Sequence, residues 1–254
     1  MRKSYFNGSF YTDNCNELTN FFSNNKSLIK NENIRAIVVP HAGYFYSGNV
    51  AKEVYKLTNG EKYKKVVVVG PSHHIYFKDA SIVLEENYET PCGNLEIDIN
   101  YSYELIKKLD FLSYIKQAHK EHSTEVQMPF IKHYFNNTKV IEIVYGDIAY
   151  QKIVLLINEI LKDKDNLLVI STDLSHFYNL KEANELDSNC IKAFKNLDIE
   201  NLQNCEACGK LGLKALIKVA KEHNLSSKLI DYKTSANASN DKTRVVGYMS
   251  GIVC

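Results

Sequence analysis

Short runs of apolar and β-branched residues alternate with amphipathic stretches along most of this chain. The runs that predict buried strands lie at residues 34–39, 65–70, 140–146, 166–171 and 245–253. Apolar residues recur at three- and four-residue spacing, as in helices that face a core, at residues 47–57, 100–109, 150–161, 180–197 and 210–222. This alternation predicts an α/β fold with a mostly parallel central sheet flanked by helices. Because no Pro/Gly/Ser-rich linker or internal repeat interrupts the series, we expect a single domain over residues 1–254.

The segment 79–100 is the least regular part of the sequence, with short apolar pieces around a Thr-Pro-Cys-Gly turn at 90–93. Turn residues between short apolar pieces are typical of a β-hairpin. We therefore expect a hairpin here, or an excursion from the main sheet.

The balance of charge and apolar content excludes several classes of protein. The 31 Lys and Arg residues almost cancel the 30 Asp and Glu residues, so the chain lacks the positive field of a dedicated nucleic-acid or anionic-membrane binder. A content of 44% hydrophobic residues is too high for a disordered chain. The apolar runs are far shorter than the roughly 20 residues that cross a bilayer, and the N-terminus carries no apolar signal segment. We expect a cytoplasmic protein.

The 6 cysteines are scattered through a chain that is long enough to build a core without disulfide bonds. Reduced thiols are therefore the expectation. Cys205 and Cys208 form an isolated CxxC ahead of a predicted helix, with no second pair at zinc-finger spacing. A metal or redox motif is one interpretation of this pair, but we favour residues that simply pack at the start of the helix.

Half of the 8 histidines come just after the end of a predicted strand. His41 follows the first strand, and His73 and His74 follow the second. Asp173 and His176 follow the strand at 166–171. In open α/β sheets, ligands bind outside the carboxyl ends of the strands. Three strands thus deliver imidazoles to one edge, which favours a functional site over isolated structural histidines.

A further polar cluster contains Glu121, His122 and Glu125. On a helix, His122 and Glu125 would face the same side. Taken alone, the cluster is more typical of a solvated helix start, where acidic residues favour the positive end of the dipole. Beside the strand-end histidines it also offers ligands, because imidazole binds Fe(II), Zn(II) and Cu(II) and transfers protons near neutral pH.

Six segments together resemble the Memo protein family. They are NGSFY at 7–11, PHAGYFYSG at 40–48, GPSHH at 70–74, EHSTEVQMP at 121–129, STDLSH at 171–176 and VVGY at 245–248. They occur in order and span almost the whole chain. The resemblance implies a fold similar to the class III extradiol ring-cleaving dioxygenases, whose members hold non-haem Fe(II) at the carboxyl edge of a mostly parallel sheet. For the ion here it implies Fe(II), with Cu or Zn as alternatives.

The resemblance also implies roles for individual residues. His41 and His73 match the two histidine ligands of the metal. His176 matches the histidine that acts as acid and base beside the metal, and Asp173 supports it.

The remaining residues of the resemblance belong to the cleft around the metal. His122, which we group with the catalytic residues, and Glu125 are expected to line this cleft together with Glu121. His74 is expected to be structural or to support a ligand. Tyr44 belongs to a tyrosine-rich loop that would flank a substrate ring.

One position departs from the family pattern. Animal Memo proteins complete the site with a cysteine before the last strand, and the dioxygenases with a carboxylate. Counted back without gaps from Tyr248, that position is Ala238, which offers no ligand atom. Asn237, Asp241 or a water molecule are the alternatives for completing the shell.

Three functions are compatible with these residues. The first is a metal-dependent, dioxygenase-like oxidoreductase acting on a small, aromatic-type substrate. The second is a module that binds a peptide or metabolite in the same cleft without chemistry, and the substitution at Ala238 favours it. Metal-dependent hydrolysis ranks last. Prokaryotic relatives are named for a radical-SAM protein and an AMMECR-type partner, so the resemblance also implies an association with such proteins.

Overall fold

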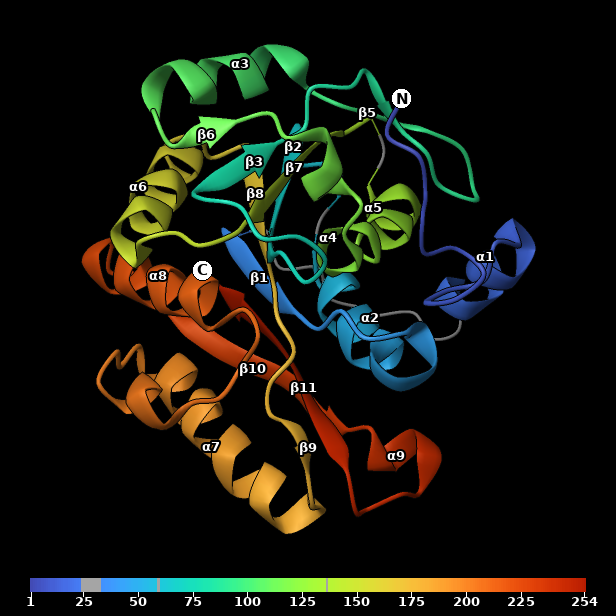
Figure 1. Cartoon of the computed structure of the whole chain (residues 1–254), viewed down its shortest axis with the longest axis vertical. Coiled ribbons are helices and arrows are strands. Elements are labelled where there is room, and N and C mark those ends of the chain that lie inside the picture. The colour runs from blue at the N-terminus through green and yellow to red at the C-terminus, as the bar shows by residue number, and fades with distance from the viewer. Residues whose placement is uncertain (24–32, 59, 136) are drawn as a thin grey trace.

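Four parallel strands form the centre of the fold. The computed structural model describes residues 1–23, 33–58, 60–135 and 137–254. The central strands are β1 (Ala36–Val39), β8 (Asn166–Ser171), β2 (Lys65–Pro71) and β7 (Lys139–Tyr145), in this spatial order (Figure 1). All three of their pairings are parallel. Their carboxyl ends therefore meet at one edge of the sheet.

Antiparallel strands extend this parallel centre on both sides. On one side, β11 (Val245–Val253) pairs with β1, and β10 (Ser227–Thr234) pairs with β11. The short β9 (His176–Tyr178) pairs with the start of β11. On the other side, β3 (Ala80–Ile82) runs antiparallel to β7, and β6 (Leu112–Ser113) runs parallel to β3. The result is a mixed, mostly parallel sheet.

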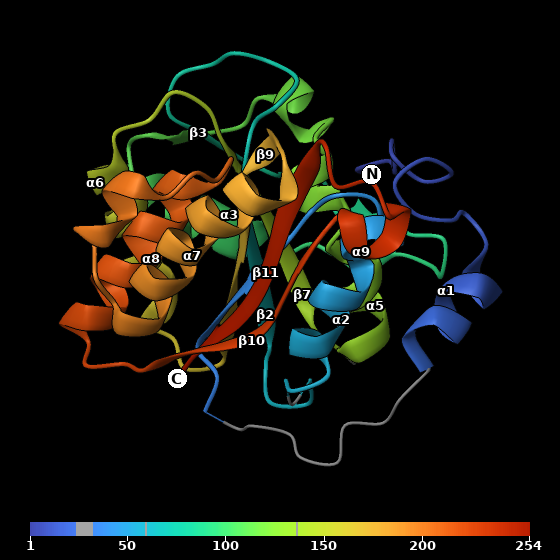
Figure 2. The same ribbon diagram turned by 90° about the horizontal axis from the view of Figure 1, so that it is seen from below.

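Helices cover both faces of this sheet, as Figure 2 shows. Alternate residues of each strand point to opposite faces, so Val67 and Val69 join one hydrophobic cluster and Val66 and Val68 join the other. The first cluster lies under α3 (Ile99–Lys108), α6 (Tyr150–Leu161), α7 (Leu180–Asn196) and α8 (Lys210–Glu222). The second lies under α1 (Cys15–Ser23), α2 (Asn49–Tyr55) and α5 (Met128–Tyr134). Burial on both faces explains why the central strands are continuously apolar.

The predicted α/β fold with a mostly parallel sheet is confirmed. The hairpin expected within 79–100 is also present, since β4 (Asn87–Tyr88) pairs antiparallel with β5 (Leu95–Glu96). The helix expected at 47–57 begins earlier, as a π-helical turn over Tyr44–Gly48 that leads into α2. Short helices complete the described part: Lys116–His119, α4 (His122–Glu125), Asn201–Asn204 and α9 (Ala236–Ser239).

The expectation of reduced cysteines is wrong for four of them. The structure joins Cys15 to Cys92 and Cys190 to Cys205 by disulfide bonds, across 77 and 15 residues of sequence. Pairing depends on the distance between segments in space, which the scattered sequence positions do not reveal. Among the described residues, no helix is long and apolar enough to cross a membrane. The cytoplasmic location stays a prediction.

Candidate metal centre

The carboxyl ends of three parallel strands and one short helix meet at this site. His41 follows β1, His73 follows β2, and Asp173 follows β8. The fourth element is α4, which begins at His122. The hydroxyl of Ser123 donates to the carbonyl oxygen of Pro71 at 2.7 Å and so ties α4 to the end of β2.

Three imidazoles converge here: His41, His73 and His122, which we call the histidine cluster. The ring centroid of His41 lies 5.2 Å from that of His73 and 5.5 Å from that of His122. The centroids of His73 and His122 are 4.6 Å apart. One ring nitrogen from each residue lies within 4.8 Å of those of the other two. The structure thus brings the two expected ligands, His41 and His73, together with His122.

Each of these rings is held at Nδ1 by a neighbouring polar group. The Oγ of Ser171 lies 3.0 Å from Nδ1 of His41. Glu121 Oε1 lies 3.0 Å from Nδ1 of His73 and 3.1 Å from Nδ1 of His122. Metal-ligating histidines characteristically bond such a partner through one nitrogen, which fixes the ring and leaves the other nitrogen for the metal.

Glu121 is fully buried, and its carboxylate accepts several hydrogen bonds. The backbone N–H of His73 donates to it at 2.6 Å, and that of Ser123 at 3.0 Å. Burial alone would raise the pKa of Glu121, but the hydrogen bonds from His73 and Ser123 outweigh burial and lower the pKa to about 2. Glu121 therefore carries a negative charge behind two imidazoles, which favours a cation in front of them.

Two of the imidazoles, His41 and His122, are held in the neutral form. Burial, followed by the charge of His41, lowers the pKa of His122 to about 3. Burial, followed by the charge of His73, holds the pKa of His41 well below its ordinary value. Neutral imidazole is the form that binds a metal, so the donor set fits a divalent ion of the first transition series.

Asp173 and His176 occupy different positions relative to the cluster. Oδ1 of Asp173 accepts a hydrogen bond from the backbone N–H of His41 at 2.7 Å, and burial raises the pKa of Asp173 to about 6. His176 is half-buried on β9, and its charge acts on both His41 and Asp173. In the described part of the chain its ring has no hydrogen-bond partner. Asp173 thus supports the backbone of His41, and His176 lies near enough to act electrostatically on both residues.

Two other expected cleft residues have partners that account for their positions. Nε2 of His74 lies 3.0 Å from Nδ1 of His122, and its exposed ring stacks on Phe6 with centroids 5.3 Å apart. Tyr44 donates from its hydroxyl to the carbonyl oxygen of Val126 at 2.7 Å. His74 therefore steadies His122, while Tyr44 is anchored to the end of α4.

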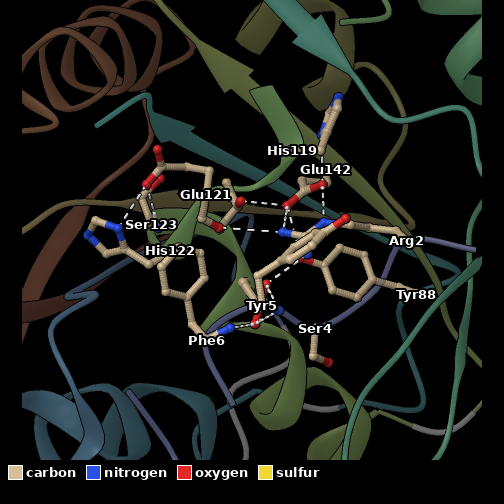
Figure 3. Close-up of polar contacts among 12 residues, drawn as sticks. Arg2, Ser4, Tyr5, Phe6, Tyr88, His119, Glu121, His122, Ser123 and Glu142 are labelled. Atoms are coloured by element: carbon tan, nitrogen blue, oxygen red, sulfur yellow. Dashed lines mark hydrogen bonds and ion pairs between the residues drawn. The ribbon is translucent and has the colours of Figure 1, made fainter. Parts of the chain in front are cut away.

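Glu125 points away from the histidines, toward the N-terminal segment. Its carboxylate accepts the backbone N–H groups of Tyr5 and Phe6 at 2.9 and 2.7 Å, and it pairs with Nη1 of Arg2 at 2.7 Å. Arg2 also pairs with Glu142, and Figure 3 shows the two beside each other, with Glu121 and His122 to one side. We call Arg2, Glu125 and Glu142 the Arg2 cluster. Glu125 was expected to line the cleft, but its contacts make it an anchor for the segment that carries Phe6.

Cys208 is a site residue that the sequence analysis did not select. Its Sγ lies 3.1 Å from Nε2 of His41, and the backbone N–H of Asp173 donates to Sγ at 3.2 Å. Burial raises the pKa of the Cys208 thiol to about 12. The interpretation that the CxxC residues only pack therefore does not describe Cys208. The motif itself was the available signal.

Ala238 lies on α9 and lines a large cavity next to the histidine cluster. This cavity has a volume of about 860 Å³, and its walls include Phe10, Tyr44 and Asn237. No member of the histidine cluster lines it. Phe10 lies between the two, because its ring centroid is 4.7 Å from that of His122. The position of the expected third ligand thus faces the cavity.

Comparison with known proteins identifies the relatives of this chain. The family model described as a Memo-like protein matches residues 2–252. The chain belongs to the Memo family. It is 34% identical to a MEMO1 family protein of Aquifex aeolicus over 99% of this chain and 98% of that protein. It is also 32% identical to a MEMO1 family protein of Methanosarcina mazei, over 100% of this chain and 99% of that protein.

Proposed function

We propose that this Memo-family chain is a metal-dependent, dioxygenase-like oxidoreductase that acts on a small aromatic-type molecule and uses Fe(II), with Cu or Zn as alternatives. The observation that carries the proposal is the convergence of imidazoles whose Nδ1 atoms are already engaged. His41 and His73 would hold the ion through Nε2, which for His41 would take the place of its contact with Sγ of Cys208. Imidazole nitrogens suit iron, copper and zinc alike, and Fe(II) is the choice that supplies chemistry with O2.

The chain's own residues would position the ligand and the substrate and transfer the proton. Asp173 holds the backbone of His41 at 2.7 Å, which fixes where that ligand enters the site. His176 is free to take a proton from a substrate hydroxyl at a ring nitrogen, because no described residue bonds its ring. Phe6 and Phe10 pack on His74 and His122 and provide an apolar wall for a substrate ring. Together they position a substrate, keep water from one side and move a proton.

The test is anaerobic reconstitution with Fe(II) followed by metal analysis and oxygen-electrode assays with a series of catechols. We expect one ion per chain and oxygen consumption with at least one catechol. The variants His41→Ala and His73→Ala should lose the ion. His223→Ala should keep it, because the ring of His223 bonds Asn158 and is not part of the histidine cluster. A wild-type protein that takes up no ion, or takes it up equally in all three variants, would overturn the proposal.

A second candidate function is ligand binding without chemistry, and the cavity beside Ala238 favours it. Aromatic residues dominate its apolar wall: Phe10, Tyr11, Phe21, Tyr44 and Phe45. Phe45 is 69% exposed and presents a large apolar ring at this cavity, where it would contact a ligand. A peptide or metabolite is one occupant under this proposal, and a protein of the AMMECR or radical-SAM type is another. Binding that persists in His41→Ala but is lost in Phe45→Ala would support this function over catalysis.

A further inference from the structure

A mononuclear centre held by His41 and His73 needs a third protein ligand to bind an ion firmly. The residues around Ala238 do not provide one. Asn237 uses its Oδ1 to accept the backbone N–H of Thr234 at 2.9 Å. Asp241 is exposed, and its carboxylate accepts the backbone N–H and the hydroxyl of Thr243 at 2.8 and 2.7 Å. The alternatives near Ala238 thus serve to shape their own turn.

His122 meets the requirements for that ligand. Its Nδ1 is occupied by Glu121 and His74, so the nitrogen that remains is Nε2. The ring of Phe10 packs against it, which restricts its rotation. A carboxylate that holds two imidazoles at once, as Glu121 holds His73 and His122, turns both rings toward a common point.

The separations agree with a single ion. Zinc–imidazole bonds are about 2.0–2.1 Å long, so the nitrogens of two imidazoles bound to one tetrahedral ion lie about 3.4 Å apart. One ring nitrogen from each member of the histidine cluster lies within 4.8 Å of those of the other two. A closure of up to about 1.4 Å between rings brings each pair to that separation. Side-chain torsions can supply such a movement without any change in the backbone.

Cys208 is the competing ligand, and its geometry is less suitable. Its Sγ contacts Nε2 of His41 at 3.1 Å, on the side where the backbone of Asp173 also bonds it. Among the described residues it belongs to no group of three ligands within 4.8 Å of one another, whereas His122 belongs to one with both His41 and His73. Cys208 therefore contacts His41, whereas His122 lies close to both His41 and His73.

We propose that His122 is the third protein ligand of the ion, so that the chain holds its metal with three histidines. Ala238, which stands where relatives have the third ligand, has no donor atom. This inference rests on the proposed metal centre. It assigns to His122 a role in coordination, with His176 as the remaining imidazole for proton transfer.

Binding of Co(II) to the full chain tests the assignment without any activity assay. The protein is freed of metal by a chelator and titrated anaerobically with Co(II), and the visible and near-ultraviolet spectra are recorded. Wild-type protein should bind one ion with nitrogen and oxygen donors, and its spectrum should lack a thiolate-to-cobalt charge-transfer band. The variant His122→Ala should bind Co(II) at least about 100-fold more weakly, because even loss of a supporting partner costs up to about that factor.

Three further variants make the result decisive. His122→Phe should lose affinity as His122→Ala does, because it has no ring nitrogen. It keeps a ring beside Phe10 and so controls for any disturbance of the fold by the smaller alanine. His223→Ala should bind as wild type does, whereas Cys208→Ala, which removes a contact to Nε2 of His41, is judged by its spectrum, which should keep the nitrogen and oxygen bands of the wild type. Unchanged affinity in His122→Phe, or a charge-transfer band that disappears in Cys208→Ala, would overturn the assignment and leave the metal centre standing. A wild-type chain that binds no Co(II), Fe(II) or Zn(II) would overturn both.

Discussion

The histidine cluster and the Arg2 cluster both include a residue of α4, His122 and Glu125, but they differ in how their polar atoms are used. Arg2 is 2% exposed, and Glu125 and Glu142 are fully buried. Their charged groups are all paired with each other or with neighbours such as His119 and Tyr88. In the histidine cluster only Nδ1 is engaged on His73 and His122, and in the described part of the chain their Nε2 atoms have no partner.

This difference separates a structural site from a functional one. Buried polar groups cost free energy unless they are paired, so a cluster with every atom paired stabilises the fold and offers nothing to a ligand. A cluster whose donor atoms face one another without partners stabilises the fold less. Binding of an ion to those atoms can restore the lost stability. Substitutions should therefore affect unfolding in the Arg2 cluster and metal binding in the histidine cluster.

The largest effect on stability is expected for Arg2→Met. The change removes the cation and leaves the carboxylates of Glu125 and Glu142 buried without it. Breaking a buried pair in this way costs about 3–5 kcal/mol. Urea unfolding of the metal-free protein, followed by circular dichroism, measures the change.

The neighbouring residue provides the control. Lys3 pairs with Glu89, but the lysine side chain is 58% exposed. Exposed pairs contribute about 0–1 kcal/mol, so Lys3→Met should cost little. Equal losses in the two variants would mean that the burial of the Arg2 cluster contributes nothing beyond an ordinary surface contact.

The next largest effect is the dependence of stability on pH. Burial alone would raise the pKa of Glu142, but the charges of Arg2 and His119 outweigh it and lower the pKa from 4.5 to about 2. A lowered pKa means that the folded state favours the carboxylate. The stabilisation is complete above about pH 4.5 and is lost as the pH falls toward 2, and it amounts to about 3 kcal/mol.

Unfolding measurements between pH 2 and 7 check this prediction against Glu142→Gln. The wild-type free energy of unfolding should fall steeply below pH 4.5, and that of the variant should fall less, because an amide does not titrate. Parallel curves would show that Glu142 does not contribute to the acid sensitivity.

Most of the fold could be predicted because the central strands are buried on both faces. The strand at 166–171 and the helices at 150–161 and 210–222 have the bounds that their apolar patterns predict. The strand β10 was missed, because it lies at the edge of the sheet and carries Lys228, Asp231 and Lys233, so it contains no apolar run. Edge strands are often charged in this way, which protects them from pairing with other chains.

The site could be predicted only as far as local sequence determines it. Histidines placed after parallel strands lie at one edge by topology alone, and the structure brings His41, His73 and His122 together there. The partner of Glu125 is Arg2, 123 residues away, and the partner of Cys208 is His41, 167 residues away. Contacts of this kind depend on tertiary packing, so the CxxC motif could draw attention to Cys208 but no local sequence could identify the partner of either residue.

A smaller effect is expected in the histidine cluster when its buried carboxylate is changed. Glu121→Gln places an amide where the Nδ1 atoms of His73 and His122 need an acceptor, so both rings lose part of their support. Loss of such a partner lowers metal affinity by about 10–100-fold, or about 1.4–2.8 kcal/mol. Co(II) titration measures the affinity, and Glu222→Gln on the exposed end of α8 is the control. Equal affinities in the two variants would contradict a supporting role for Glu121.

The smallest effect is expected for His74→Ala. This exposed ring bonds Nδ1 of His122 and stacks on Phe6, but Glu121 still holds His122 when it is removed. Stability should change by about 0.5 kcal/mol or less, as for most surface substitutions, and Co(II) affinity should fall by about tenfold or less. Comparison with His73→Ala sharpens the result, because the two histidines are adjacent in sequence and His73, unlike His74, belongs to the group that contains both His41 and His122. If His74→Ala weakened binding as much as His73→Ala, the ion would lie on the His74 side of His122, where His74, Glu121 and His122 form the other candidate group.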